Sequence, residues 1–201
     1  MSAAQELWIV ASQRVLLRNW TRNDAVAQEL WPPYTEPFHS FWNLVRLESY
    51  YDYGRSGSQR YIWAVDDVSG RLLGRISLRE ISSDSSSARL GISLSAAHLS
   101  QGLGSEAMGL FLSYYFGSLG FRTMLLDVAA CNRRAVRCYE RLGFSYMESD
   151  WRSAGNDPTL RLLSEPHYAH MASYFRRGRF ETHVEFYEMR LDRSAWRGEN
   201  R

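Results

Sequence analysis

Two short motifs in the second half of the chain carry residues whose types and spacing could do chemistry. The first is Gly102-Leu103-Gly104-Ser105, which follows a predicted strand and opens a predicted helix. Glycines let a backbone approach a ligand closely, and the free N–H groups at a helix start favour an anion such as a diphosphate. A Gly-x-Gly before a helix can also be purely structural. The third glycine of a dinucleotide-binding fingerprint is missing, and a P-loop needs a lysine.

The second motif places a tyrosine two helical turns after a capping residue. Asn132 is a typical N-cap, Gly143 is a typical helix stop, and Tyr139 lies seven residues after Asn132. A tyrosine in this position can bury its ring and present its hydroxyl at the edge of a cleft. It can equally be a core aromatic residue, so the spacing alone leaves both interpretations open.

Composition excludes several classes of function. The 201 residues include 24 basic side chains, all of them arginine, so no lysine Schiff base or catalytic lysine is available. A net charge of +2 is too small to indicate a nucleic-acid partner. Cys131 and Cys138 are too few for a zinc cluster or a disulfide framework, and we therefore expect no metal and a reducing, cytoplasmic location. Met108–Phe121, the most apolar stretch, is short for a membrane span, and the N-terminus does not resemble a secretory signal.

The order of hydrophobic periods predicts a mixed α/β fold. The predicted strands and helices are listed here in chain order: strand 14–18, helix 21–30, helix 38–53, strands 61–66, 72–81 and 89–94, helix 105–119, strand 123–129, helix 132–142, and strands beginning at 144 and 184. We expect one domain over residues 1–201 with a long insert at about 151–182. The insert should contain a helix that begins near Ser164 and ends at Gly178.

The stretch from Arg89 to Phe144 resembles the GNAT superfamily of acyl-CoA-dependent N-acyltransferases, most closely the branch with the ribosomal-protein alanine N-acetyltransferases. The matching residues are Gly91-Ile92-Ser93-Leu94, the run from Leu99 to Ala107, Asp127, Asn132, Tyr139 and Leu142-Gly143-Phe144. Arg14–Arg18 with Asp24 also matches the start of that branch. The resemblance implies a mostly antiparallel sheet with splayed central parallel strands and flanking helices.

The resemblance also implies acetyl-CoA as the acyl donor. The pantetheine arm would pair with the backbone of Ile92, Ser93 and Leu94, and the diphosphate would bind the loop that begins the next helix. The residues implied in coenzyme binding are Ile92, Ser93, Leu94, Leu99, Ser100, Gln101, Gly102, Leu103, Gly104, Ser105 and Asn132. Leu99 departs from the family pattern, which has Arg or Gln there, and Gln101 is the neighbouring polar side chain that could partly substitute.

A primary amine would then attack the thioester directly, without a covalent enzyme intermediate. The resemblance implies Tyr139 as the general acid toward the departing thiolate, and a backbone N–H near Leu94 as the donor to the thioester carbonyl. Asp127 fits the base by position, with Glu80 in reserve or a water relay, but Asp127 could instead be the structural partner of an arginine. Neither Cys131 nor Cys138 is needed as a nucleophile.

The sequence leaves the acceptor open among a protein N-terminus, an aminoglycoside, a polyamine and another small amine. The first two predicted helices and the aromatic insert would shape its site, and Arg176, Arg177 and Arg179 add a basic edge that could favour an acidic partner or be a solvated helix end. The insert could equally cover a neighbouring subunit of a homodimer. We expect no nucleic acid and no membrane as partners. The alternative function is a non-catalytic acyl-CoA-binding or interaction module of the same fold.

Overall fold

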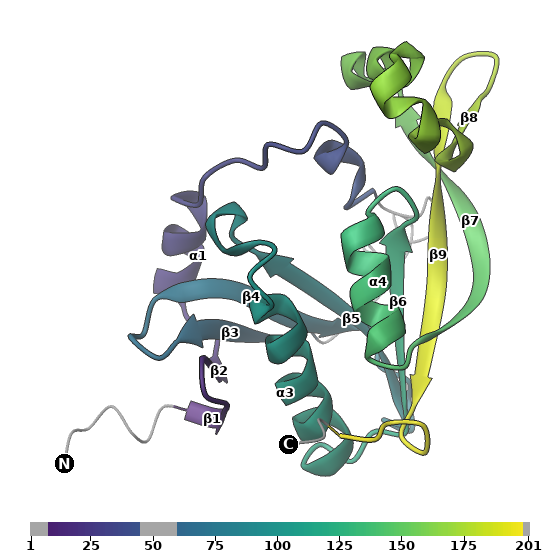
Figure 1. Cartoon of the computed structure of the whole chain (residues 1–201). Coiled ribbons are helices and arrows are strands. Elements are labelled where there is room, and N and C mark those ends of the chain that lie inside the picture. The colour runs from purple at the N-terminus through teal and green to yellow at the C-terminus, as the bar shows by residue number, and fades with distance from the viewer. Residues whose placement is uncertain (1–7, 45–59, 199–201) are drawn as a thin grey trace. The chain divides into compact units, whose positions relative to one another are not determined.

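The computed structural model describes residues 8–44 and 60–198, and its strands form one mixed sheet (Figure 1). The hydrogen-bonded strand order is β1-β2-β3-β4-β5-β6-β9-β7, with β8 paired to β9. The neighbours β5 and β6 are parallel, whereas β1 to β5 pair antiparallel in sequence, as β9 does with β7 and β8. The strands are β1 Trp8–Ala11, β2 Val15–Asn19, β3 Tyr61–Asp67, β4 Leu72–Arg79, β5 Ser87–Leu94, β6 Thr123–Ala129, β7 Ser145–Gly155, β8 Phe175–Arg177 and β9 Thr182–Asp192. The predicted mixed, mostly antiparallel sheet is thus confirmed.

Three α-helices and four short 3-10 helices accompany the strands in the part of the chain that the structure describes. The α-helices are α1 Arg22–Glu29, α3 Leu103–Gly117 and α4 Arg133–Arg141, and the 3-10 helices are His39–Phe41, Ala96–His98, Pro158–Ser164 and Pro166–Tyr174. None of the described helices is long and apolar enough to cross a membrane.

The chain divides into two compact units. The first unit comprises Met1–Tyr34, Ser58–Leu125 and Leu191–Arg201, and the second comprises Thr35–Gly57 and Leu126–Arg190. Strands β6 and β9 run from one unit into the other. The predicted coenzyme loop belongs to the first unit, whereas the predicted catalytic residues belong to the second.

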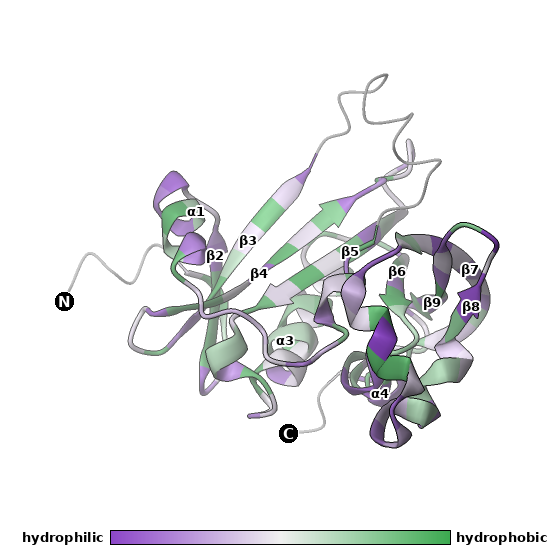
Figure 2. Cartoon of the chain, turned by 90° about the horizontal axis from the view of Figure 1, so that it is seen from above, coloured by the Kyte–Doolittle hydropathy of each residue, from purple (hydrophilic) through white to green (hydrophobic). Residues whose placement is uncertain are grey.

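Aromatic packing of α3 on the sheet builds the core of the first unit. Along β4 the buried Ile76 and Leu78 alternate with half-buried polar residues, as expected of a strand with one face in the core, and Figure 2 shows this alternation of hydropathy. Residues 63–66 of the neighbouring β3 are all buried. The ring of Trp63 lies 5.0 Å from that of Phe111, and Tyr115 stacks on Phe121 at 4.5 Å with an interplanar angle of 10°. These contacts fix α3, and with it the loop at its N-terminus.

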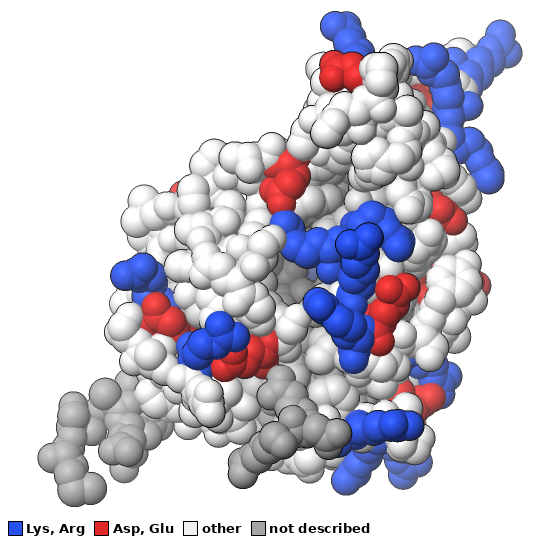
Figure 3. Space-filling model, in the orientation of Figure 1, with Lys and Arg blue, Asp and Glu red and all other residues white. Residues whose placement is uncertain are grey.

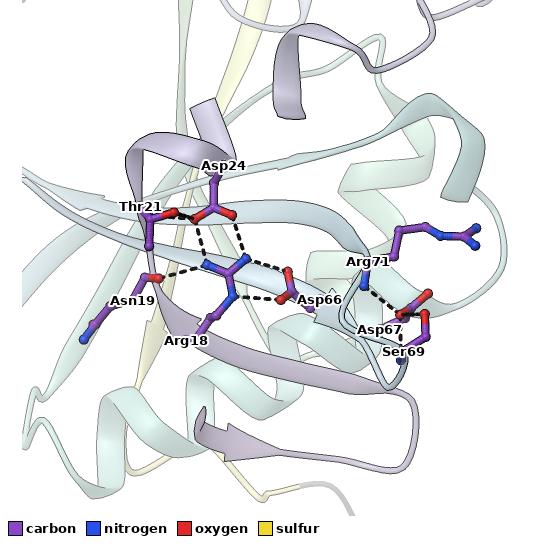
Figure 4. Close-up of polar contacts among 8 residues, drawn as sticks. All are labelled: Arg18, Asn19, Thr21, Asp24, Asp66, Asp67, Ser69 and Arg71. Carbon is purple, nitrogen blue, oxygen red and sulfur yellow. Dashed lines mark hydrogen bonds and ion pairs between the residues drawn. The ribbon is translucent and has the colours of Figure 1, made fainter. Parts of the chain in front are cut away.

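The N-terminus of α1 is fixed by a buried charge cluster. Arg18 binds Asp24 at 2.6 Å and Asp66 at 2.8 Å, and the backbone and hydroxyl of Thr21 both donate to Asp24 (Figure 4). Thr21 and Asp24 thereby form a capping box. In the neighbouring hairpin turn, also drawn in Figure 4, the Asp67 carboxylate accepts from the backbone and hydroxyl of Ser69 and from the backbone N–H of Arg71. The start predicted for this helix from Thr21 to Asp24 is therefore correct.

A cluster of buried apolar residues forms the core of the second unit. Phe38 and Phe41 come from the segment before the undescribed residues, Val184 and Phe186 from β9, and Ala129 from the end of β6. Half-buried residues of the insert pack against this cluster. The aromatic insert therefore has a structural role in covering one face of the second unit.

Several predicted boundaries differ from the structure. The helix expected over 38–53 is a 3-10 turn at His39–Phe41 that is followed by a non-helical turn up to Leu44, and residues 45–53 of that prediction lie outside the described residues. The predicted strand at 72–81 ends at Arg79, so Glu80 lies beyond the strand and has a positive φ of 49°. Strand β1 was not predicted.

The predicted single helix from Ser164 to Gly178 is wrong. Two 3-10 helices, Pro158–Ser164 and Pro166–Tyr174, are followed by β8. Each begins at a proline, and Glu165 between them is extended, because a residue before proline disfavours the helical conformation. Strand β7 continues to Gly155 through its pairing with β9, so the connection between them spans 156–181.

Candidate functional site

The loop that precedes α3 has the backbone geometry of an anion site. Ser100 and Gly102 both have positive φ, of 60° and 79°, and α3 begins at the next residue, Leu103. The first turn of an α-helix points N–H groups outward that have no partner within the helix, and the helix dipole adds partial positive charge there. The 15-residue α3 can therefore hold a phosphate or diphosphate at its N-terminus.

The two glycines of this motif differ in what a side chain would meet. Gly102 is the N-cap of α3 and adopts a left-handed conformation, which is costly for residues with a Cβ. Gly104 has no such conformation, but a Cβ on it would lie 2.7 Å from Cδ1 of Leu94. The start of α3 thus packs closely against the end of β5, and the loop and the predicted pantetheine strand are positioned by one contact.

An arginine from the N-terminal hairpin holds the loop in place. Arg14 pairs with Glu106 of α3 at 2.6 Å and donates through Nη1 to the carbonyl of Gln101 at 3.3 Å. The hydroxyl of Ser12 also donates to Glu106, at 2.6 Å. Burial opposes ionisation of Glu106, but the bonds from Ser12 and Arg14 outweigh it and lower the pKa of this carboxyl. The side chain of Arg14 is 55% exposed, so the loop carries a cation that solvent and ligands can reach.

Positions 99 and 101 of this loop, where a polar side chain could contact the coenzyme, have local structural roles. Leu99 is half-buried directly after the 3-10 turn Ala96–His98, and its side chain offers no hydrogen bond. The side-chain amide of Gln101 donates to the carbonyl of Ala97 at 3.0 Å and so braces the loop. Arg14 brings a positive charge to the same loop through its bond to the Gln101 carbonyl.

The backbone of β5 alternates between bonding to β4 and facing away from it. Ser95 N–H donates to the Leu73 carbonyl at 2.8 Å, and the register pairs Gly74 with Leu94. In an antiparallel ladder every second pair points its N–H and C=O groups outward, so those of Ile92 and Leu94 face away from β4. The hydroxyl of Tyr34 donates to the Leu94 carbonyl at 2.6 Å. The N–H near Leu94 that fits a carbonyl-polarising role is therefore that of Leu94 itself, because Ser95 N–H is bonded to Leu73.

Tyr139 is buried on α4 in the second unit. Asn132 caps the helix by accepting from Ala135 N–H at 3.2 Å, as predicted. The Tyr139 side chain is 9% exposed, and its ring lies 5.8 Å from that of Phe144. Burial raises the pKa of Tyr139, and the nearby Cys138 and Asp127 raise it further. The phenol is consequently protonated at neutral pH, as a proton donor must be.

Asp127 is held by a buried arginine. Its Oδ2 accepts from Nη1 of Arg152 at 2.7 Å, and both side chains are less than a tenth exposed. Arg152 also donates to the Leu44 carbonyl at 2.7 Å and stacks on the ring of Phe186 at 3.9 Å. Asp127 therefore acts electrostatically on Tyr139 while it is the ion-pair partner of an arginine, as one of the two sequence interpretations anticipated.

The reserve base and the cysteines also have definite surroundings. Glu80 pairs with Arg89 at 2.7 Å and is about half exposed. Burial raises the pKa of the Cys131 thiol to about 12, which keeps it protonated and a poor nucleophile at neutral pH. No group of three or more His, Cys, Asp or Glu residues with metal-binding geometry is found in ranges 8–44 and 60–198.

The three arginines of the basic edge of the insert are exposed, and two of them lie over aromatic rings. Arg176 lies 4.2 Å from the ring centroid of Trp151, and Arg179 lies 5.2 Å from that of Phe180. Figure 3 shows basic side chains gathered at the upper right, over β8 and the turn that follows it. Since the exposed Phe180 belongs to this turn, the edge is an aromatic and basic surface rather than a solvated helix end.

Each unit brings together one part of the predicted site. The first unit brings the β5 residues Ile92–Leu94 beside the loop 99–105, through the contact of Leu94 with Gly104. The second unit brings Asp127 and Tyr139 within electrostatic range, with Asn132 at the start of the same helix as Tyr139. Sequence reasoning missed Tyr34 and the partnerships of Arg14 with Glu106 and of Arg152 with Asp127. Each joins residues far apart in the chain, and no local pattern could have revealed it.

Comparisons with known proteins bear on the family of the chain. A family model described as an acetyltransferase (GNAT) domain matches residues 14–145. A spermidine N(1)-acetyltransferase of Vibrio cholerae is 30% identical over 111 residues, which are 55% of this chain and 62% of that protein. The chain thus matches less than two thirds of the length of that curated relative.

Solved structures agree at the level of the fold. The spermidine N-acetyltransferase of Vibrio cholerae in complex with CoA and spermine has a TM-score of 0.56 and 22% identity, covering 92% of this chain and 98% of that one. A chimera based on the same enzyme has a TM-score of 0.58 and 24% identity, covering 91% and 97%. The resemblance to the ribosomal-protein branch stays a prediction. The family model covers about two thirds of the residues. The chain therefore belongs to the GNAT family of acetyltransferases.

Proposed function

We propose that the protein transfers an acetyl group from acetyl-CoA to a primary amine by direct attack, with Tyr139 as the general acid. The observation that carries the proposal is the loop before α3, where Gly102, Gly104 and the Arg14–Glu106 pair fix the backbone at the N-terminus of a long helix in a chain of this family. The proposal extends over the single domain 1–201, with the connection after β7 as part of the acceptor region.

The residues of the first unit suit the two polar parts of acetyl-CoA. The loop 99–105 and the N-terminus of α3 would hold the diphosphate with backbone N–H groups, and Arg14 would add positive charge. The outward-facing backbone N–H and C=O of Ile92 would bond the amide groups of the pantetheine arm, as an added strand does, which leaves the Leu94 N–H for the thioester carbonyl. Asn132 of the second unit, which uses its side chain as a helix cap, would contribute through the half-buried start of α4.

The chemical step needs two proton movements. The neutral amine attacks the thioester carbon, the C–S bond breaks, and the thiolate takes its proton from the Tyr139 hydroxyl. Burial makes the phenol a weaker acid than in water, but a thiolate that forms in the same apolar surroundings is also more basic, so their proton affinities remain matched. The Leu94 N–H would stabilise the oxyanion that forms on the thioester carbonyl.

The proton on the attacking amine is assigned to a water chain. Asp127 is committed to Arg152 and Glu80 to Arg89, so each carboxylate already has a guanidinium partner that reduces its basicity. We propose that Asp127 orients the water and stabilises the positive charge that forms on the attacking amine near Tyr139. Bulk solvent then receives the proton that the amine loses.

A matched pair of variants tests the role of the phenol. Tyr139→Phe should lower the rate of CoA release at least tenfold and leave the dissociation constant of acetyl-CoA within twofold, because only the proton donor is removed. Tyr146→Phe, at an exposed tyrosine of β7, is the control and should leave the rate unchanged. An unchanged rate for Tyr139→Phe would remove Tyr139 from the mechanism.

Leu99 favours a second candidate function, a non-catalytic acyl-CoA-binding module. Its side chain cannot contact a diphosphate, and coenzyme affinity then depends on the backbone and on Arg14. Measuring thiol release with an amine panel separates the two functions, because the module would bind acetyl-CoA and release no CoA with any amine. The panel should hold spermidine, suggested by the name of the Vibrio cholerae relative, and a peptide with N-terminal alanine, the acceptor of the ribosomal-protein branch. A cytoplasmic location and a homodimer remain proposals, which fractionation and gel filtration test.

A further inference from the structure

One arginine of the first unit is half-buried on the face of the sheet opposite the α3 core. Arg75 lies on β4 between the fully buried Gly74 and Ile76, whose side of the strand packs inward. The strand register pairs Arg75 with Ala64 of β3 and with Ser93 of β5. Directly opposed residues of a sheet point to the same face, so Arg75 is a neighbour of Ser93 on the strand that we assign to pantetheine.

The charge of Arg75 has no counterion among the residues that the structure describes. Arg18, two strands away on the same cross-strand row, is neutralised by Asp24 and Asp66. The groups that act on the pKa of Arg75 are different: burial lowers it first, and the nearby positive charge of Arg60 lowers it further. The phenol of Tyr34 is the third group close enough to act on it.

An uncompensated guanidinium with partial burial is an unfavourable element of a fold. A buried cation normally has a carboxylate partner, because without one it loses its hydration and gains no opposite charge in return. Replacing Arg75 by a neutral residue would relieve that cost, so its position next to the acyl-donor strand suggests that its partner comes from outside the chain. Tyr34 marks the same place, since its hydroxyl donates to Leu94, the residue after Ser93.

We propose that Arg75 binds an anionic group, a carboxylate or a phosphate, carried by the acceptor amine. This inference rests on the proposed function and narrows its substrate class. A guanidinium offers two parallel N–H groups to either anion, and with Arg60 close by the site attracts negative charge. A polyamine, which carries only positive charges, would be repelled there. The acceptor would thus differ in charge from the substrate named for the Vibrio cholerae relative.

The test compares acceptors that share a chain length and differ in the group at one end. One pair is 4-aminobutanoate and 1,4-diaminobutane, and the other is 2-aminoethyl phosphate and 1,2-diaminoethane. In each pair the anionic member should have at least tenfold higher kcat/KM, and the pair with the larger ratio identifies the anion as carboxylate or phosphate. Arg75→Gln should remove this preference by raising KM for the anionic member at least tenfold, with little effect on the diamine.

Arg71→Gln is the matched control, because Arg71 is exposed at the turn of the β3–β4 hairpin and its bond to Asp67 uses the backbone N–H. This variant should leave both acceptor ratios unchanged. A wild-type preference for the diamines, or an anion preference that survives in Arg75→Gln, would overturn the proposal.

A binding measurement keeps the proposal testable without turnover. Inorganic phosphate is titrated by calorimetry at constant ionic strength with CoA saturating, so that the coenzyme's own phosphate sites are filled. The wild type and Arg71→Gln should bind phosphate at least tenfold more tightly than Arg75→Gln. Equal phosphate affinities in all three proteins would overturn the anion site. If none of the four amines is acetylated, the phosphate titration alone tests the anion site. Phosphate binding that depends on Arg75, together with no release of CoA for any of these amines or of the amine panel above, would instead refute the proposed function and leave the anion site standing.

Discussion

Gly104→Ala separates the packing role of this glycine from helix propensity. The added Cβ would stand 2.7 Å from Cδ1 of Leu94, so the leucine methyl, or the start of α3, must move. Overpacking of this kind costs about 1–3 kcal/mol, while alanine in place of glycine gains up to about 1 kcal/mol in a helix. The balance predicts a loss of about 1 kcal/mol in the free energy of unfolding. Because Leu94 is also the predicted contact of the acyl donor, the dissociation constant of acetyl-CoA should rise about tenfold.

Gly117→Ala is the control on the same helix. A Cβ at Gly117 would meet no atom within 4 Å, so only the propensity gain remains, about 0.5 kcal/mol of stabilisation. Acetyl-CoA affinity should not change. Urea denaturation measures the stability of each variant, and calorimetric titration measures the affinity.

A double-mutant cycle assigns the cost to one contact. In a Leu94→Ala background the clashing methyl is absent, so Gly104→Ala should no longer destabilise the protein relative to that background. The reasoning would be refuted if Gly104→Ala were as stable as Gly117→Ala in the presence of Leu94, or if its cost persisted unchanged in the Leu94→Ala background.

Two further predictions concern the charge clusters of the first unit. Glu106 has a folded-state pKa below its usual 4.5, so its stabilising contribution is complete well above that value and is lost as the pH falls from there through the lowered pKa. Over a series of measurements from about pH 5 to about pH 3, the melting temperature should therefore fall less for Glu106→Gln than for the wild type, and parallel curves would contradict this. Arg18→Met leaves the buried Asp24 and Asp66 without their cation and should lower the free energy of unfolding by about 3 kcal/mol, measured by urea denaturation at pH 7. The control Arg22→Met should be nearly neutral, and a loss below about 1 kcal/mol for Arg18→Met would show that the cluster does not stabilise the fold.

Local signals in the sequence were sufficient for elements that begin and end with capping residues. Thr21 and Asp24 predict the start of α1, and Asn132 with Gly143 predicts both ends of α4, because caps act within three or four residues. The glycine motif before α3 was equally local. The sequence indicates the left-handed conformation of Gly102, because this is a property of the loop itself. It does not indicate the contact of Gly104 with Leu94, ten residues earlier in the chain.

Contacts between residues far apart in the chain set the features that the sequence did not predict. Strand β7 extends to Gly155 because β9 offers a partner more than 25 residues later in the chain, and this shortens the connection that follows. The sequence left Asp127 open between a base and the partner of an arginine, and the ion pair with Arg152, 25 residues later in the chain, identifies that partner. Arg75 likewise became distinctive only when the register showed that Arg18, in the same row, has two carboxylates and Arg75 has none among the described residues.

Calorimetric titration of acetyl-CoA against acetyl-pantetheine tests the central claim most directly, because the two thioesters differ in the diphosphate and nucleotide that the loop before α3 is proposed to bind. We expect acetyl-CoA to bind at least 100-fold more tightly, and we expect Arg14→Gln to narrow that ratio. Equal affinity for the two thioesters, or no heat of binding with acetyl-CoA, would contradict the assignment of this loop as the coenzyme site.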